Sequence, residues 1–194
     1  MPRKPGLDTA QVVRAAAELI DQEGLEGLTL NRLARRLSIQ TPSLYNHVGG
    51  MPGLQRELAR LNAHELGLCL TDAALGKSGA EALQSVAQAY RAYIKAHPGL
   101  YLASLRASGR EDPPDLELQA AEDRVVRVAL AVVASFGLQG EDGLHAVRGL
   151  RSLIHGFATL EIAGGFGLPL DCDESFRRLL AMFIQGLSPC PPAD

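Results

Sequence analysis

Apolar side chains recur at every third or fourth position along nearly all long segments of this chain, which is the spacing of an α-helix with one buried face. Alternating apolar and polar runs bounded by hairpin turns, the pattern of β-strands, are absent from the sequence. We therefore expect an all-α protein of about nine helices, three of them short.

The first fifty residues predict three helices with well-marked ends. Gly24 ends an amphipathic helix that begins near Thr9, and Thr29 is a good N-cap for a helix over residues 30–37. Pro42 opens a third helix over residues 41–47, because proline is favoured in the first helical turn. A three-residue turn between two short helices is typical of a helix-turn-helix, whose second helix enters the major groove of DNA.

The rest of the chain predicts a larger helical module. Long helices are expected over residues 51–75, 115–136, 141–163 and 173–186, with another after the capping residue Ser78 and a short one ending near Ala107. We therefore divide the chain into a helix-turn-helix domain at 1–50, a larger helical domain at 51–187 and a disordered tail at 188–194.

Composition and cysteine usage exclude several classes of protein. With 46% hydrophobic and 21% charged residues, the chain is neither disordered nor fibrous. Its three cysteines include no CxxC pair, which argues against a disulfide scaffold or a zinc ribbon and favours a reducing cytoplasm. The N-terminus lacks the apolar core of a secretory signal, and the longest apolar stretch is too short to span a membrane. We expect a cytoplasmic protein with no membrane partner.

Charge is distributed unevenly along the chain. The formal net charge is −3, but the first 64 residues carry eight Lys or Arg against six Asp or Glu, whereas the remainder carries eleven against sixteen. Such a difference suggests that only the first third of the chain meets a polyanion.

The outward side chains of the third predicted helix are the candidates for DNA contact. Thr41, Ser43 and Asn46 are placed to read base edges, Asn46 that of an adenine. Three further side chains are placed to contact phosphates: Tyr45, His47 and Thr29. Arg3 and Lys4 form an N-terminal arm that can reach the adjacent minor groove. The predicted DNA-binding residues are Thr29, Arg32, Thr41, Pro42, Ser43, Tyr45, Asn46, His47, Arg3 and Lys4.

At these residues the chain resembles the TetR/AcrR family of transcription regulators. Residues 27–48 read GLTLNRLARRLSIQTPSLYNHV, and the segment TPSLYNHV is especially similar to the recognition helix of tetracycline repressors. Residues 150–157 (LRSLIHGF), followed by Glu161, look like the C-terminal domain of one TetR subgroup. The strong match covers about residues 9–58, and beyond it the resemblance is architectural.

The resemblance implies a dimer formed by the last two helices and a ligand cavity in the 51–187 domain that controls binding to a palindromic double-stranded operator, most often as a repressor. One residue departs from the family pattern: Met51 stands where many members carry a phosphate-binding lysine. We therefore expect modest DNA affinity and a shallow dependence on salt, although a backbone amide there can still contact phosphate.

Polar and aromatic side chains that interrupt the apolar faces of the larger domain are candidates for binding an unknown small-molecule effector. For each of them a structural role in the core, or a hydrogen bond within or between subunits, is the alternative interpretation. The predicted ligand-binding residues are Tyr90, Tyr93, His97, Tyr101, Leu105, His155, Phe157 and Glu161.

Signals for catalysis are poor. The motifs HExxH, GxSxG, GxxxxGK and GxGxxG do not occur, and the five histidines do not cluster with carboxylates at metal-ligand spacing. We expect no enzyme activity, no catalytic residue, no metal and no cofactor. Two other functions stay open: a helical dimeric binding protein with a vestigial helix-turn-helix, which Met51 and the weak positive charge favour, and an enzyme on a helical scaffold.

Overall fold

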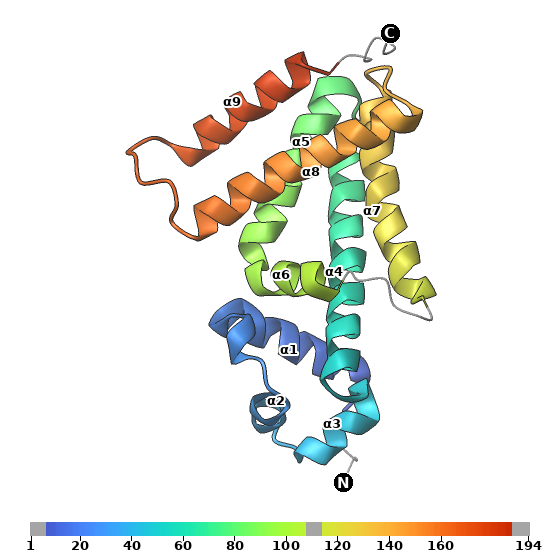
Figure 1. The fold of residues 1–194 in the computed structure, drawn as a ribbon, viewed down its shortest axis with the longest axis vertical. Helices are drawn as coiled ribbons and strands as arrows, with labels where there is room; N and C mark the ends of the chain where they lie inside the picture. The colour runs from blue at the N-terminus through green and yellow to red at the C-terminus, as the bar shows by residue number, and fades with distance from the viewer. Residues whose placement is uncertain (1–6, 108–113, 188–194) are drawn as a thin grey trace. The chain divides into compact units, whose positions relative to one another are not determined.

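The structure is a computed structural model that describes residues 7–107 and 114–187, and within these ranges it contains nine α-helices and no strand (Figure 1). The helices are α1 (Thr9–Glu23), α2 (Leu30–Arg36), α3 (Thr41–Val48), α4 (Gly50–Ala74), α5 (Gly79–Ala96), α6 (Pro98–Ala107), α7 (Leu116–Ala134), α8 (Gly140–Ile162) and α9 (Cys172–Gln185). The predicted all-α fold is confirmed. Predictions made for Arg3, Lys4 and the 188–194 tail lie outside the described residues.

Most helix ends follow from local signals in the sequence. Gly24, with a φ of 77°, ends α1, and the Thr29 side chain caps α2 by accepting a hydrogen bond from the Arg32 amide at 3.2 Å. Pro42 lies in the first turn of α3, as predicted. The sequence did not predict η1, a single 3-10 turn at Leu25–Gly27 between α1 and α2.

The described helices belong to two compact units, which are considered separately. The first comprises residues 1–65 and 96–121, and the second comprises residues 66–95 and 122–194. The first unit therefore contains α1 to α3, most of α4, all of α6 and the start of α7. Its core contains these buried side chains: Val12, Val13, Ala16, Ala17, Ile20, Leu33, Ala34, Leu44, Val48, Leu54, Leu58, Leu100 and Ala103.

The contact between α1 and α6 explains why α6 belongs to the first unit. Gly99 packs so closely that a Cβ there would lie 2.2 Å from the Ile20 carbonyl oxygen. One carboxylate oxygen of Asp21 accepts a hydrogen bond from the Leu100 amide at 2.9 Å, and the other lies 3.1 Å from Nδ1 of His97. The end of α1 thus holds the start of α6.

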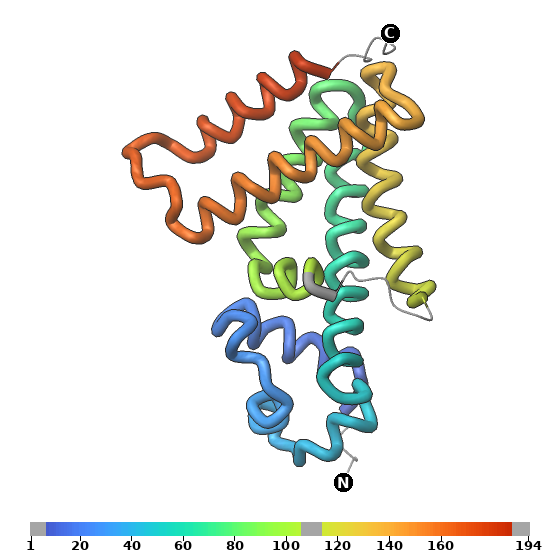
Figure 2. The backbone as a smooth tube through the Cα atoms, viewed as in Figure 1, coloured from blue at the N-terminus to red at the C-terminus, as the bar shows by residue number. Residues whose placement is uncertain are grey.

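In the second unit, α8 and α9 run antiparallel and are joined by the loop at 163–171 (Figure 2). The facing sides of the two helices are apolar, with Ile154 and Leu150 of α8 and Phe176 and Leu180 of α9 buried. Gly149 allows close approach, because a Cβ there would lie 3.3 Å from the Phe183 ring. The pairing of the last two helices follows from this contact.

Candidate nucleic-acid interface

One face of α3 is fixed to the core of the first unit. Leu44 and Val48 are buried at 0% and 6% exposure, and the Thr9 hydroxyl of α1 donates a hydrogen bond to the His47 carbonyl oxygen at 3.1 Å. Their spacing of four residues places both apolar side chains on one side of the helix. The opposite side of α3 is therefore held in a defined orientation.

The polar side chains predicted to meet DNA lie on that other side. Tyr45 is 57% exposed and Asn46 is exposed, while Ser43 and His47 are half-buried. None of these four side chains makes a hydrogen bond or ion pair with another described residue. Donors and acceptors without internal partners, on a helix whose opposite face is packed in the core, are available for contacts to base edges and phosphates.

The two predicted contacts on α2 are already engaged in the structure. The Thr29 oxygen accepts from a backbone amide as the N-cap, and the Arg32 guanidinium forms an ion pair with Glu23 of α1. Arg36 likewise pairs with Glu18 at 3.0 Å. DNA contact by Arg32 stays a prediction and requires the guanidinium to share or exchange its carboxylate partner.

Sequence reasoning missed two residues on α2. Asn31 is exposed and accepts a hydrogen bond from the Thr41 hydroxyl at 2.9 Å, so it joins α2 to the first residue of α3. Arg35 is exposed and has no ion-pair partner among the described residues. Arg35 had a signal, since it is a cation on the polar side of a helix-turn-helix, whereas the link from Asn31 to Thr41 depends on tertiary structure.

A glycine pair forms the junction between α3 and α4. Gly49 and Gly50 have φ values of 63° and 87°, a region that only glycine enters readily. A Cβ at Gly53 would lie 1.8 Å from the Val48 carbonyl oxygen, so the start of α4 rests directly on the end of α3. Met51 is half-buried and packs against the core of the first unit, which gives it a structural role where a lysine would supply charge.

Beside this junction lies a polar hollow of about 280 Å³, lined by His47, Val48, Gly53, Arg56, Glu57, Arg60 and Asp115. Arg60 lies 2.9 Å from Asp115, 3.1 Å from Glu57 and 2.8 Å from Glu117. The pKa of Asp115 is lowered, first by the hydrogen bond from the Leu118 amide and then by Arg60. The Arg60 guanidinium is thus shared among three carboxylates of the protein.

The predicted effector-binding residues fall in both compact units. His97, Tyr101 and Leu105 belong to the first, and His97 there contacts Asp21. The others belong to the second, where Tyr90, Tyr93 and Phe157 are buried. No observation places a ligand against them, so their role in binding stays a prediction.

Glu161 takes part in an ion-pair cluster around the buried Arg91. Its carboxylate receives two hydrogen bonds from Arg91, at 2.7 and 2.8 Å, and one from Lys95 at 2.6 Å, while Asp173 of α9 accepts from Arg91 at 2.7 Å. The Arg91 guanidinium also lies about 5 Å from two phenylalanine rings, 5.2 Å from that of Phe157 and 4.9 Å from that of Phe176. The bonds from Arg91 hold the pKa of Glu161 below its usual value. The cluster ties α5 to both α8 and α9.

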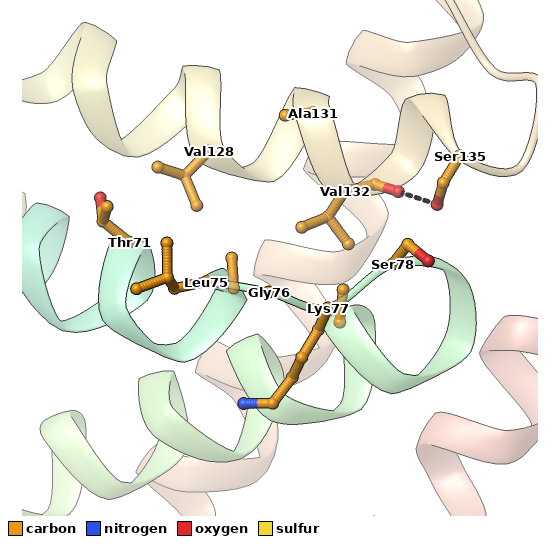
Figure 3. A pocket seen from close by; sticks show the side chains of 11 residues that line it. Thr71, Leu75, Gly76, Lys77, Ser78, Val128, Ala131, Val132 and Ser135 are labelled. Atoms are coloured by element: carbon orange, nitrogen blue, oxygen red, sulfur yellow. Dashed lines mark hydrogen bonds between the residues drawn. The ribbon is translucent and has the colours of Figure 1, made fainter.

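The second unit also contains an apolar hollow of about 350 Å³ between the end of α4, the start of α5 and α7 (Figure 3). Its walls include Ala74, Leu75, Val128 and Val132. Three polar groups at its edge make hydrogen bonds within the protein: Thr71 donates to the Gly67 carbonyl, Lys77 to the Ala73 carbonyl and Ser135 to the Val132 carbonyl. None of the predicted ligand-binding residues lines this hollow.

Two findings concern functions other than DNA binding. Within residues 7–107 and 114–187, no helix combines the length and the apolarity needed to cross a membrane. Over the same ranges, no three His, Cys, Asp or Glu side chains are grouped so that they could hold a metal ion.

Comparison with known proteins identifies the family. Residues 12–58 match the model of bacterial regulatory proteins of the tetR family, and residues 83–183 match the tetracyclin repressor-like C-terminal domain. The HTH-type transcriptional regulator YobS of Bacillus subtilis (strain 168) is 33% identical over 188 residues, which cover 96% of each chain.

Solved structures share the fold. A protein from Rhodococcus sp. RHA1 superimposes with a TM-score of 0.79 at 22% identity, covering 96% of this chain and 98% of the other. A variant of the TetR protein of Acinetobacter baumannii AYE, in complex with minocycline, gives a TM-score of 0.70 at 22% identity, with 93% and 96% covered. YobS and the family that residues 12–58 match are transcriptional regulators and not enzymes. With both family models matched in order along one chain, this protein belongs to the TetR family of transcriptional regulators.

Proposed function

We propose that this regulator is a repressor that binds a palindromic operator as a dimer and leaves it when a small-molecule effector binds. In this proposal residues 1–50 contact DNA, and residues 51–187 form the dimer and hold the effector. The observation that carries the DNA-binding part is the outer face of α3, where Ser43, Tyr45, Asn46 and His47 lack partners among the described residues while Leu44 and Val48 fix the helix. Each copy of α3 reads one half-site in the major groove, with half-sites about one helical turn apart.

The DNA-binding part is tested by selecting bound sequences from a randomised duplex pool with the purified protein, then measuring Kd by fluorescence anisotropy. Asn46→Ala is expected to weaken specific binding by about 1–3 kcal/mol at one base pair. Tyr45→Phe removes a phosphate contact and should weaken binding to all sequences alike. Gln84→Ala, an exposed change on α5 away from the proposed DNA and dimer surfaces, is the control. If no sequence is enriched, the helix-turn-helix is vestigial and the chain is a helical binding protein.

Apolar side chains left exposed on α8 and α9 support the dimeric part of the proposal. Leu160 is 52%, Ile162 43% and Met182 61% exposed, and no atom lies within 4 Å of the place where a Cβ of Gly156 would stand. A surface of large apolar groups with a notch at a glycine is suited to packing against helices of a second copy. Reading two half-sites also needs two copies, because one short helix contacts only a few base pairs.

Sedimentation velocity tests this interface. Leu160→Glu combined with Met182→Glu is expected to convert the dimer into a monomer, because it places unpaired charge inside the contact. Leu75→Glu is the control, since Leu75 is 78% exposed at the end of α4. A double variant that sediments as the unchanged protein would count against the α8–α9 interface.

The effector part rests on the family and on two features of the second unit: the predicted residues Tyr90, Tyr93, His155, Phe157 and Glu161, and the apolar hollow of Figure 3. The hollow's volume of about 350 Å³ is within the usual range for small-molecule sites. Because most of its walls are alanine, valine and leucine side chains, it suits an uncharged, mainly apolar molecule.

A thermal-shift screen of small molecules, followed by operator release, tests the effector. Ala131→Phe fills the hollow, whereas Tyr93→Phe and His155→Ala alter predicted ligand contacts. Whichever variant abolishes the thermal shift without lowering the melting temperature of the free protein marks the binding site.

A further inference from the structure

The link between the two helices of the helix-turn-helix bears on which bases α3 reads. Thr41 is the first residue of α3, and Asn31 lies in the first turn of α2. The Thr41 hydroxyl donates its hydrogen bond to Oδ1 of Asn31 at 2.9 Å. Asn31 is exposed and Thr41 is half-buried, so the pair lies at the surface.

This hydrogen bond fixes the chemical character of Thr41. A threonine hydroxyl has one proton and two lone pairs, and by itself it rotates to donate or to accept. Here the proton is committed to Asn31, which leaves only the oxygen lone pairs for a DNA base. The Asn31 amide group, in turn, keeps its two N–H donors, which have no partner among the described residues.

The major groove distinguishes an acceptor from a donor. Adenine presents its N6 amino group there and cytosine its N4 amino group, whereas guanine O6 and thymine O4 present only acceptors at the corresponding edge. A free hydroxyl suits either kind of base, but a hydroxyl that can only accept suits an amino group.

We propose that Asn31 is a specificity-determining residue that orients the Thr41 hydroxyl as an acceptor, so that each operator half-site carries adenine or cytosine opposite Thr41. This inference rests on the proposed function, because it requires α3 to enter the major groove. It assigns to α2 a role in reading sequence through a side chain that need not touch the base itself. Asn31 is in this sense a positioning residue.

Two substitutions at position 31 separate this role from general effects on binding. Asn31→Ala removes the acceptor and frees the Thr41 proton, so the preference for amino-bearing bases should disappear. Asn31→Asp keeps a carboxyl oxygen to accept the proton and therefore should keep the preference, while its negative charge weakens binding to every sequence and most at low salt. Thermal melting of each variant checks that the fold is intact.

The experiment measures Kd for the full chain on the selected operator with each of the four base pairs at every half-site position. The position opposite Thr41 is the one where Thr41→Ala changes base preference most. There the unchanged protein should prefer adenine or cytosine about fivefold or more, which is the size of a modest base contact. In Asn31→Ala the four bases should fall within about twofold, and in Asn31→Asp the preference should persist.

Several results would overturn the inference. A preference for guanine or thymine at that position means that Thr41 donates, and an unchanged preference in Asn31→Ala means that Asn31 does not orient it. The inference is also contradicted if Thr41→Ala changes the base preference at none of the half-site positions. In all these cases an operator has still been selected, so the proposed function stands. If the unchanged protein selects no operator, both the proposed function and this inference fail.

Discussion

At the scale of single residues, the turn between α2 and α3 contains one residue in a backbone conformation that is unfavourable for any side chain. Ser38 is the one residue other than glycine, among those described, with a positive φ, 55°. A side chain in this left-handed region meets the following carbonyl oxygen, whereas glycine does not. The turn therefore retains some strain.

Ser38→Gly is expected to stabilise the protein by about 0.5–1 kcal/mol, because relief of strain exceeds the added freedom of the unfolded chain. Urea unfolding followed by circular dichroism measures the change. Ser38→Ala keeps the Cβ and should give no gain, so an equal stabilisation in both variants would contradict the explanation.

Gly53 is expected to be intolerant of any side chain. A Cβ there would lie 1.8 Å from the Val48 carbonyl oxygen, so Gly53→Ala must move α3 away from α4. We expect a loss of about 2–3 kcal/mol in unfolding free energy, together with weaker operator binding. The control is Gly67→Ala in the same helix, where the nearest atom is 3.6 Å away. That change should be neutral or stabilising by up to about 1 kcal/mol, since alanine favours helix.

At the scale of elements, the Arg91 cluster holds α5, α8 and α9 together through charge in addition to apolar contact. The side chains of Arg91 and Glu161 are only 9% and 14% exposed. Removing one partner of such a pair leaves an uncompensated charge in a poorly solvated place, which costs more than the intact pair contributes. The stability of this part of the protein therefore depends on the ionisation of Glu161.

Glu161→Gln is expected to destabilise the protein by about 2–3 kcal/mol at pH 7, less than the full effect of a broken buried pair because Asp173 still contacts Arg91. The pKa of Glu161 is lowered in the folded state, so its contribution is complete above its unfolded pKa of about 4.3 and is lost as the pH falls through the lower folded pKa. The difference in unfolding free energy between variant and unchanged protein should therefore shrink below about pH 4.

Glu174→Gln provides the comparison. Glu174 pairs with Arg177 and Arg178, and its pKa is lowered to about 2, but the group is exposed to solvent. Screening makes such surface pairs weak. A Glu174→Gln variant as unstable at pH 7 as Glu161→Gln would mean that burial is not what makes the Arg91 cluster important.

The sequence was sufficient to predict where the helices begin and end, but it was insufficient to predict the contacts between residues far apart in the chain. Gly24, Thr29 and Pro42 act on their own helix ends, and the long helices begin and end within two residues of the predicted bounds. The side of α3 that faces outward could also be predicted, because Leu44 and Val48 are apolar, lie four residues apart and so share the buried side of the helix. His97 was interpreted as a ligand candidate, but its contact with Asp21 joins residues 76 positions apart, which no periodicity reveals. The hydrogen bond from Thr41 to Asn31 could not be predicted either, because it depends on how α2 and α3 pack against each other.

At the scale of the whole molecule, the helix-turn-helix does not complete its own core. Leu100 and Ala103 of α6 are 1% and 6% exposed and belong to the core of the first unit. A fragment of about 60 residues is marginal even when its core is complete. The helix-turn-helix therefore depends on a segment that follows much later in the chain.

We expect a fragment of residues 1–65 to lack cooperative unfolding, whereas residues 1–121 should unfold cooperatively. Circular dichroism in increasing urea compares the two fragments. In the full chain, Leu100→Ala should cost about 2–5 kcal/mol, as for other buried leucines. A cooperative transition in the 1–65 fragment would show that α6 is dispensable for the core.

The division into two discontinuous units means that the backbone passes from one to the other three times, after residues 65, 95 and 121. Two of these passages fall inside the continuous helices α4 and α7, and the third falls at the end of α5. A single proteolytic cut therefore cannot release either unit from the other. Two of the three covalent connections between the units are therefore made of helical backbone, in which the amides and carbonyls are hydrogen-bonded, and not of flexible linker sequence.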